Sequence, residues 1–355
     1  MSALDLVTLA LVVAVIGASA LVGDATLPRR ALAVCAVMLG TTALVSALLR
    51  AVPGDPADSI LGDQAPADAR LALDRELGVV DEAGHPLGAL PQIARFVRGS
   101  ASALVLAVAP ASWEPELAPR LASEPRSFRT REPVRLVIAR RLGNTAVLAL
   151  AAFVIAALLG IGLGVVAAAR RGRFMAGAAE AITLLGVAVP RFFLAPVLVL
   201  LFSIQLHWLP PSGADAGLRS LVLPALSLGT ALAALIARMT RSSLDSVLAS
   251  DLVRTARAKG LSEPAVVAKH ALLNALPPVI TVMGLQVGGL FAGAVVTEKV
   301  FAWPGIGLLL VESIQRLDVP VVQGIVLVTA LGTALATLSA DAIIRALDPR
   351  VRRRA

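Results

Sequence analysis

Apolar residues gather in seven long runs that are separated by shorter polar segments. The runs lie at residues 4–23, 31–49, 143–169, 176–206, 221–240, 277–300 and 321–345. Each is close to or above the ~20 residues with which a helix crosses about 30 Å of hydrocarbon. The runs are rich in Leu and Ala and lack the apolar–polar alternation of membrane β-strands. Because backbone polar groups in lipid must be satisfied within the segment, the pattern predicts an all-α integral membrane protein.

The composition and the charges refine this picture. Hydrophobic residues make up 57% of the 355 positions, and the single cysteine, Cys35, can form no disulfide within the chain. Basic residues gather at 29–30, 170–173, 238–269 and 350–354, whereas the short segments 207–220 and 298–320 hold few. Arg and Lys near span ends favour the cytoplasm. Seven alternating spans then place the N-terminus outside and the basic C-terminal tail inside.

The first run admits a second interpretation. GASA at 17–20 is like the cleavage site of a signal peptide, but the preceding MSALD carries no positive charge. We therefore expect a retained extra span. The predicted organisation is 1–30 extra N-terminal span and linker, 31–50 first core span, 51–138 extracytoplasmic segment, 139–247 three core spans, 248–276 cytoplasmic elbow, 277–347 last two core spans with an outer amphipathic segment, and 348–355 basic cytoplasmic tail.

The long external segment contains several local signals. PADSIL and DARLALDREL predict two short helices that end at Gly62 and Gly78, because glycine is favoured just past a helix end. The apolar run 101–109 is too short to span a membrane. PVRLVIARRLGNT at 133–145 is amphipathic and predicts a surface helix before the next span.

The segment 248–276 predicts a helix–turn–helix elbow inside the cell. DLVRTARAK is helical in pattern, Gly260 is placed to end it, and Ser262 can begin a second helix that runs to about Asn274, before two prolines. Arg254, Arg257 and Lys259 give the elbow a positive face. The alternative is a solvated loop whose charges only follow the positive-inside rule. The tight glycine corner favours the elbow, since a passive loop does not need it.

RTARAKGL at 254–261, followed by KHALLNALPPV, resembles the cytoplasmic loop of permease subunits from binding-protein-dependent ABC importers, most closely the dipeptide/oligopeptide (and nickel) branch. RAVPGDPA, WLPPSG, LVLPALSLG and VVTEKVFAWPGIGLLLVESI resemble other family segments, so the likeness covers about 31–354. The first two positions of the general E-A-A-x-x-x-G signature fall on Arg254 and Thr255 and depart from it. Two further departures are the span at 4–23 and the segment 99–135, which lacks the usual G-D-x-G.

The resemblance implies a type I ABC importer transmembrane fold, with six core spans plus the extra N-terminal one, in the bacterial inner membrane. The elbow would dock into a groove on a cytoplasmic ATPase. Expected partners are a homologous second permease, ABC ATPases, an extracytoplasmic binding protein and a peptide substrate. The expected coupling residues are Arg254, Thr255, Ala256, Arg257, Lys259, Gly260, Leu261, His270 and Asn274.

The chain offers no hydrolytic motif of its own. Its three lysines do not stand in a phosphate loop, and no G-x-S-x-G or H-E-x-x-H occurs. The three histidines fall on both sides of the predicted membrane, so they cannot form one metal site. We therefore expect a non-enzymatic subunit without a cofactor, with ATP and Mg bound by the partner ATPase.

Four residues are candidates for the translocation pathway: Arg191, Gly288, Gly289 and Glu298. Arg191 falls mid-run, where a charge is costly unless it faces a cavity or a partner. It could attract a peptide carboxylate, or form a structural ion pair with Glu180 or Glu298. The paired glycines at 284/288 and 289/293 could line the pore or a subunit interface, or occur by chance.

The resemblance thus implies an importer subunit for di- or oligopeptides. Nickel chelates or other small solutes are the alternative within the branch. An ion-coupled secondary transporter would want paired intramembrane acids and inverted repeats, of which the sequence shows no clear trace. An intramembrane hydrolase would need a catalytic arrangement that the sequence lacks.

Overall fold

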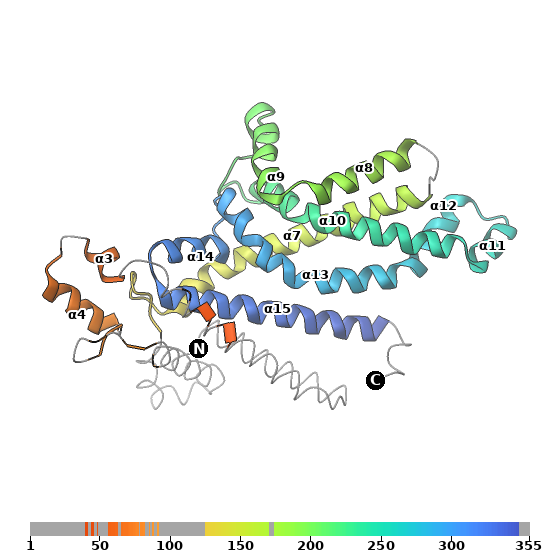
Figure 1. Cartoon of the computed structure of the whole chain (residues 1–355). Coiled ribbons are helices and arrows are strands. Elements are labelled where there is room, and N and C mark those ends of the chain that lie inside the picture. Colours follow the sequence, from red (N-terminus) through yellow and green to blue (C-terminus); the bar gives the residue numbers. More distant parts are fainter. Residues whose placement is uncertain are drawn as a thin grey trace. The chain divides into compact units, whose positions relative to one another are not determined.

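The computed structural model describes residues 125–169 and 174–347 continuously, and parts of 40–91 (Figure 1). In these residues the chain is mostly helical, and an isolated antiparallel bridge joins Arg126 and Pro133. The helices are α3 Pro56–Leu61, α4 Ala67–Leu77, α7 Val134–Ala169, α8 Phe174–Ala188, α9 Arg191–Leu198, α10 Leu218–Leu248, α11 Asp251–Ala258, α12 Glu263–Ala265, α13 Leu272–Val300, α14 Ile306–Gln315 and α15 Val319–Leu347. Two π-helical stretches, η2 Val199–Gln205 and η3 Val266–Ala271, continue α9 and precede α13.

The runs predicted at 143–169, 221–240, 277–300 and 321–345 are confirmed as helices. In the described residues, three continuous helices are long and apolar enough to cross a membrane: Val134–Ala169, Leu218–Leu248 and Glu263–Leu290. The first predicted run and most of the second lie outside these residues, as do 101–109 and the C-terminal tail.

The run at 176–206 is not one straight span. It divides at Pro190 into α8 and the helix formed by α9 with η2, and the two parts are bent by 117°. Proline lacks an N–H and disfavours a helical residue before it, which explains the break at this position. The segment is therefore either a broken fourth span or a re-entrant loop.

Helix α7 corrects the prediction of a separate surface helix over 133–145. It runs unbroken for 36 residues from Val134 and includes the whole amphipathic segment. At about 1.5 Å per residue it is longer than the hydrocarbon core is thick. In contrast, the helices that were predicted to end at Gly62 and Gly78 are confirmed as α3 and α4, and Gly62 has φ +84°.

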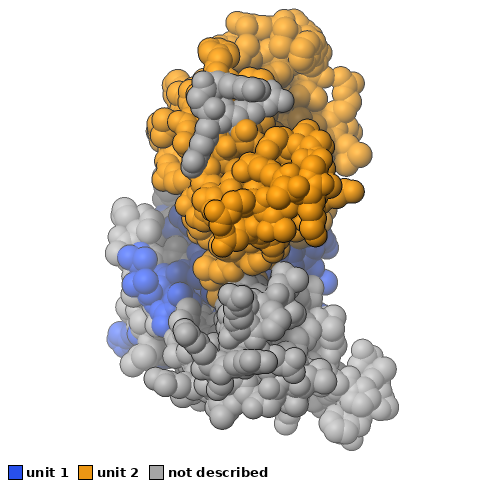
Figure 2. Space-filling view, turned by 90° about the vertical axis from the view of Figure 1, so that its right-hand side faces the viewer, with its two compact units in different colours: residues 1–143, 308–334 blue, residues 144–307, 335–355 orange. Residues whose placement is uncertain are grey.

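Internal contacts divide the chain into two compact units (Figure 2): residues 1–143 with 308–334, and 144–307 with 335–355. In the first, the Ser127 hydroxyl and the Phe128 amide donate to the Asp318 carboxylate. Gly324 gives Val134 and Ile138 room, because a Cβ there would lie 2.6 Å from the Val134 side chain. These contacts join the start of α7 to the start of α15.

The second unit is built around α10, which packs against α8, α9 and α13. Gly160 and Gly164 of α7 face α10 closely. A Cβ on Gly160 would lie 2.6 Å from the Cβ of Ile236, and a Cβ on Gly164 would lie 2.5 Å from the Cβ of Thr240. Small residues at four-residue spacing allow this approach of two helices in a membrane. Leu148, Leu228, Leu232, Ile236, Val279, Leu290 and Trp303 belong to the buried core that results.

Candidate functional site

The predicted elbow is present between α10 and α13. Helix α11 begins after Ser250 and ends at Ala258, and Gly260 adopts φ +77° at the corner. Its apolar side is anchored, since Val253 and Ala256 are buried in a cluster with Leu244, Val266 and Ala271. The other side of α11 is exposed, and so is Leu261 just after the corner. The elbow is thus packed along one side of α11 and open at its corner.

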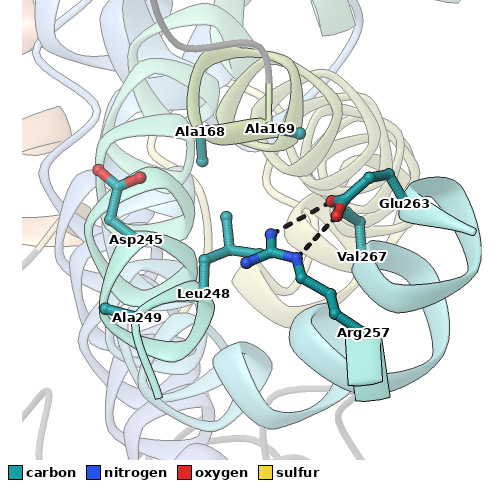
Figure 3. Close-up of a pocket in the computed structure, with 8 residues that line it drawn as sticks. All are labelled: Ala168, Ala169, Asp245, Leu248, Ala249, Arg257, Glu263 and Val267. Atoms are coloured by element: carbon teal, nitrogen blue, oxygen red, sulfur yellow. Dashed lines mark hydrogen bonds and ion pairs between the residues drawn. The ribbon is translucent and has the colours of Figure 1, made fainter. Parts of the chain in front are cut away.

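An ion pair closes the elbow across its corner. Arg257 of α11 donates from Nε and Nη2 to the two carboxylate oxygens of Glu263, at 2.7 and 3.2 Å (Figure 3). The hydrogen bonds of this pair raise the pKa of Arg257 and lower the pKa of Glu263, since each favours the charged form of both groups. Both residues are exposed, so the pair orients the two arms of the elbow more than it stabilises the fold.

The positive face of the elbow is smaller than its sequence indicates. Arg254 pairs with Asp251 on the same helix, and Arg257 is engaged by Glu263. Among the three predicted cations, Lys259 alone forms no ion pair with a described residue. The exposed surface at the corner therefore combines one uncompensated charge with Gly260 and the apolar Leu261.

The second arm differs from the predicted short helix ending near Asn274. It begins with α12 at Glu263, passes through the π-helical stretch η3 and continues as α13 to Val300. Pro277 and Pro278 lie inside α13. The helix continues across them, and Ala275 and Val279 are buried on either side.

Thr255 is exposed on α11, and the last two predicted coupling residues sit on the second arm. His270 lies in η3, and the Asn274 amide donates to its carbonyl at 2.6 Å. Ser262 precedes α12 with extended backbone angles, as a capping residue does, but its side chain makes no capping hydrogen bond. The turn is therefore set by backbone geometry and the Arg257–Glu263 pair.

A pocket of about 270 Å³ lies beside the elbow (Figure 3). Its wall combines the C-terminal ends of α7 and α10 with both arms of the elbow, and the residues are Ala168, Ala169, Asp245, Leu248, Ala249, Arg257, Glu263 and Val267. The Arg257–Glu263 pair forms part of this wall. Movement of the elbow would therefore act directly on the ends of two spans.

A second corner follows α13 at the opposite end of that helix. The side chain of Glu298 is fully buried. Its carboxylate accepts a hydrogen bond from the Thr145 hydroxyl at 2.6 Å and another from the Gly307 amide at 2.7 Å. The Thr145 oxygen in turn accepts from the Ile306 amide at 2.8 Å. A buried carboxyl thus satisfies the first amides of α14, with the help of a residue from α7.

The outer turn, residues 301–307, is held tightly against Glu298. A Cβ on Gly305 would overlap the Glu298 carboxyl group, and one on Gly307 would lie 2.6 Å from Val295 Cα. The Trp303 indole donates to the Asn144 carbonyl at 3.0 Å, and the Asn144 amide donates to the Pro304 carbonyl at 2.8 Å. The two glycines are required here by space.

The four predicted pathway residues lie in different surroundings. Arg191 begins α9, but its side chain lies outside the described residues. Both of its suggested partners are engaged elsewhere: Glu180 pairs with Arg241, and Glu298 is held in the outer turn. Gly288 is buried and Gly289 is exposed.

Sequence reasoning missed several residues that the structure brings together. Thr145 and Asn144 serve the outer turn from more than 150 positions away, and Arg241 links α10 to α8. The Gly160/Gly164 spacing could have indicated the close contact of α7, whereas the partners of Glu298 left no local signal. The described residues contain no group of His, Cys, Asp and Glu that could hold a metal ion.

Comparison with known proteins places this architecture. Residues 160–353 match the family described as binding-protein-dependent transport system inner membrane component. The chain is 36% identical over 324 residues to the glutathione transport system permease protein GsiC of Escherichia coli strain K12, covering 91% of this chain and 97% of that protein. It is 37% identical over 324 residues to the protein of the same name from Salmonella choleraesuis strain SC-B67, with the same coverage.

A solved structure shows the same fold. The chain is similar to one from the inward facing MetNI methionine ABC transporter, with a TM-score of 0.52 and 20% identity, covering 61% of this chain and 99% of that one. The predicted family and fold class are confirmed. The chain belongs to the family of inner membrane components of binding-protein-dependent transport systems, as a non-catalytic, multi-pass permease subunit of a type I ABC importer that works with a partner permease, ATPases and a binding protein.

Proposed function

We propose that this permease moves di- or oligopeptides into the cell, driven by a separate ATPase through the elbow at 252–274. The observation that carries the coupling role is the geometry of the elbow. It has a buried inner side that includes Val253 and Ala256, and an exposed corner at Gly260 and Leu261. The support for a peptide is the likeness to glutathione permeases, since glutathione is a tripeptide.

The residues of the elbow have distinct proposed tasks. Gly260 and Leu261 make the close contact with the ATPase, and Lys259 adds a charge at the same corner. Ala256, which was also expected at this contact, is buried and anchors the elbow to the spans instead. Arg254, Thr255 and Arg257 shape the first arm, while His270 and Asn274 shape the second. ATP and Mg are bound by the ATPase, and its closure pushes the elbow against the ends of α7 and α10.

The proposed orientation follows from the charges. The basic tail 348–355 lies in the cytoplasm, the N-terminus lies outside, and 51–138 faces the binding protein. Within the membrane, Arg191, Gly288 and Gly289 border the path of the peptide. Glu298 acts on that path through the outer turn that it holds.

The decisive experiment is transport by the complete complex in proteoliposomes. Uptake of labelled di- and tripeptides should require ATP, the binding protein and an active ATPase. It should stop when the partner ATPase carries a substitution that abolishes hydrolysis. Uptake of a nickel chelate in place of peptides would support the other substrate class, and uptake that continues with the inactive ATPase would contradict the mechanism.

A further inference from the structure

Gln286 is an exposed amide in the middle of a membrane-spanning helix. It lies fourteen residues from each end of α13, Leu272–Val300, so it falls near mid-membrane. Its side chain is exposed and forms no hydrogen bond with a described residue. Because an unpaired amide in hydrocarbon is costly, Gln286 must face either water or another polar group.

Several other polar side chains in the spans are satisfied within their own helix, whereas the buried hydroxyls of Ser227 and Thr240 are not. The hydroxyls of five threonines donate to a carbonyl of their own helix three or four residues earlier, and these are Thr183, Thr230, Thr281, Thr329 and Thr333. Such bonds remove the need for an external partner. Gln286 has no equivalent, so its amide remains available in this chain.

The direction of Gln286 favours the interior of the bundle over lipid. Positions 279, 283, 290 and 294 pack into the core of the second unit, and position 286 continues this spacing of three and four residues. The packed face is therefore interrupted at Gln286. Gly289 is exposed beside it, and a Cβ there would lie 3.8 Å from Gln286 Oε1, at ordinary van der Waals distance.

We propose that Gln286 lines the translocation pathway and hydrogen-bonds the backbone amides of the peptide in transit. A glutamine amide both donates and accepts, so it matches a peptide bond without selecting any side chain. Gly289 leaves space for the backbone next to it. This inference rests on the proposed function, because it assumes a peptide as the cargo.

The first test measures access to water. The single native cysteine is first removed by Cys35→Ser. Two variants, Gln286→Cys and Leu285→Cys, are then assembled into the complex and treated with a charged, membrane-impermeant thiol reagent. Leu285 is the control, because it is adjacent to Gln286 and 51% exposed. Since the reactive thiolate forms in water, Gln286→Cys should react at least about tenfold faster than Leu285→Cys, and protection by peptide is expected. An unreactive Gln286→Cys that cross-links to the sister permease would overturn the proposal.

The second test measures the hydrogen bond. Gln286→Leu should lower uptake of a peptide by about tenfold, the scale of one hydrogen bond, while the complex stays assembled. Backbone N-methylation of the peptide should lower uptake by the wild type but add little in Gln286→Leu. If N-methylation of the peptide lowered uptake equally in the wild type and in Gln286→Leu, the proposed hydrogen bond to the peptide backbone would be contradicted. If the wild type moves no peptide at all while Gln286→Cys still reacts, the proposed cargo fails and the pathway position stands.

Discussion

The two corners at the ends of α13 are both held by a glutamate, but in opposite environments. At the inner elbow, Glu263 is exposed and pairs with a charged partner, Arg257. At the outer turn, Glu298 is fully buried and accepts from a hydroxyl and a backbone amide. An exposed ion pair is weak and screened by salt, whereas a buried carboxyl group that loses its partners is strongly destabilising. The comparison indicates a rigid outer turn and an adjustable inner elbow.

This difference suits an importer in which force enters at the elbow. Gly260 has no atom within 4 Å of an added Cβ, so the corner is open, whereas Gly305 and Gly307 are enclosed. We infer that the elbow can adapt to a moving ATPase while the outer turn keeps its shape. The predictions below challenge that contrast, beginning with the largest expected effect.

Gly305→Ala should destabilise the protein most. The added Cβ would overlap the buried Glu298 carboxyl group, so overpacking and broken hydrogen bonds together should cost about 3 kcal/mol or more. Thermal unfolding in detergent measures this loss. The matched control is Gly162→Ala in α7, where the new Cβ meets nothing within 4 Å and stability should hold or rise slightly. Equal effects of the two substitutions would contradict a tightly packed outer turn.

Glu298→Gln should have the next largest effect. An amide can still accept the Thr145 hydroxyl, but its NH₂ group would then face the Gly307 N–H, so one acceptor is lost. A buried donor without its acceptor costs about 1–3 kcal/mol. The measurement is again thermal unfolding, with Glu263→Gln as the exposed counterpart, which should change stability little. If Glu298→Gln and Glu263→Gln changed the unfolding temperature equally little, burial of Glu298 would not be what distinguishes the two corners.

The two corners also differ in how far the sequence predicted them. The inner elbow was predicted because its determinants are local: a glycine at the bend, a serine after it and a proline in the next turn. The outer turn depends on Thr145, which is 153 positions from Glu298, so no pattern near either residue announces the contact. Glu298 was consequently assigned to the pathway from its place in the sequence alone.

Helix lengths were predicted less well than helix positions. The amphipathic start of α7 was separated from its span, and the arm after the elbow was ended before Pro277. In both cases a local signal, amphipathicity or a proline, is outweighed by packing: Val134 and Ile138 are buried at the start of α7, as are Ala275 and Val279 around the prolines. Such contacts belong to the tertiary structure and cannot be inferred from local preferences.

Gly260→Ala should affect coupling more than folding. The corner needs φ +77°, a left-handed conformation that costs a residue with a Cβ roughly 1–2 kcal/mol. Gly260→Asn is the matched variant, since asparagine tolerates this conformation and nothing lies near the added side chain. Peptide uptake per ATP hydrolysed should fall in the alanine variant and largely recover in the asparagine variant. Normal coupling in the alanine variant would show that the corner is not where force enters.

The smallest effect is expected for the Arg257–Glu263 pair. Arg257→Glu places two acids across the corner and should reduce stimulation of the ATPase by the loaded binding protein, while the double exchange with Glu263→Arg restores the pair. High salt should mimic part of the loss, because exposed charges are screened. The pH dependence has a fixed sign. The folded pKa of Glu263 is lowered, so the contribution is present at neutral pH and is lost as the pH falls through that lowered value. The double exchange could also fail to rescue coupling at every salt concentration. That result would mean that Arg257 and Glu263 each contact the ATPase directly rather than act through their ion pair.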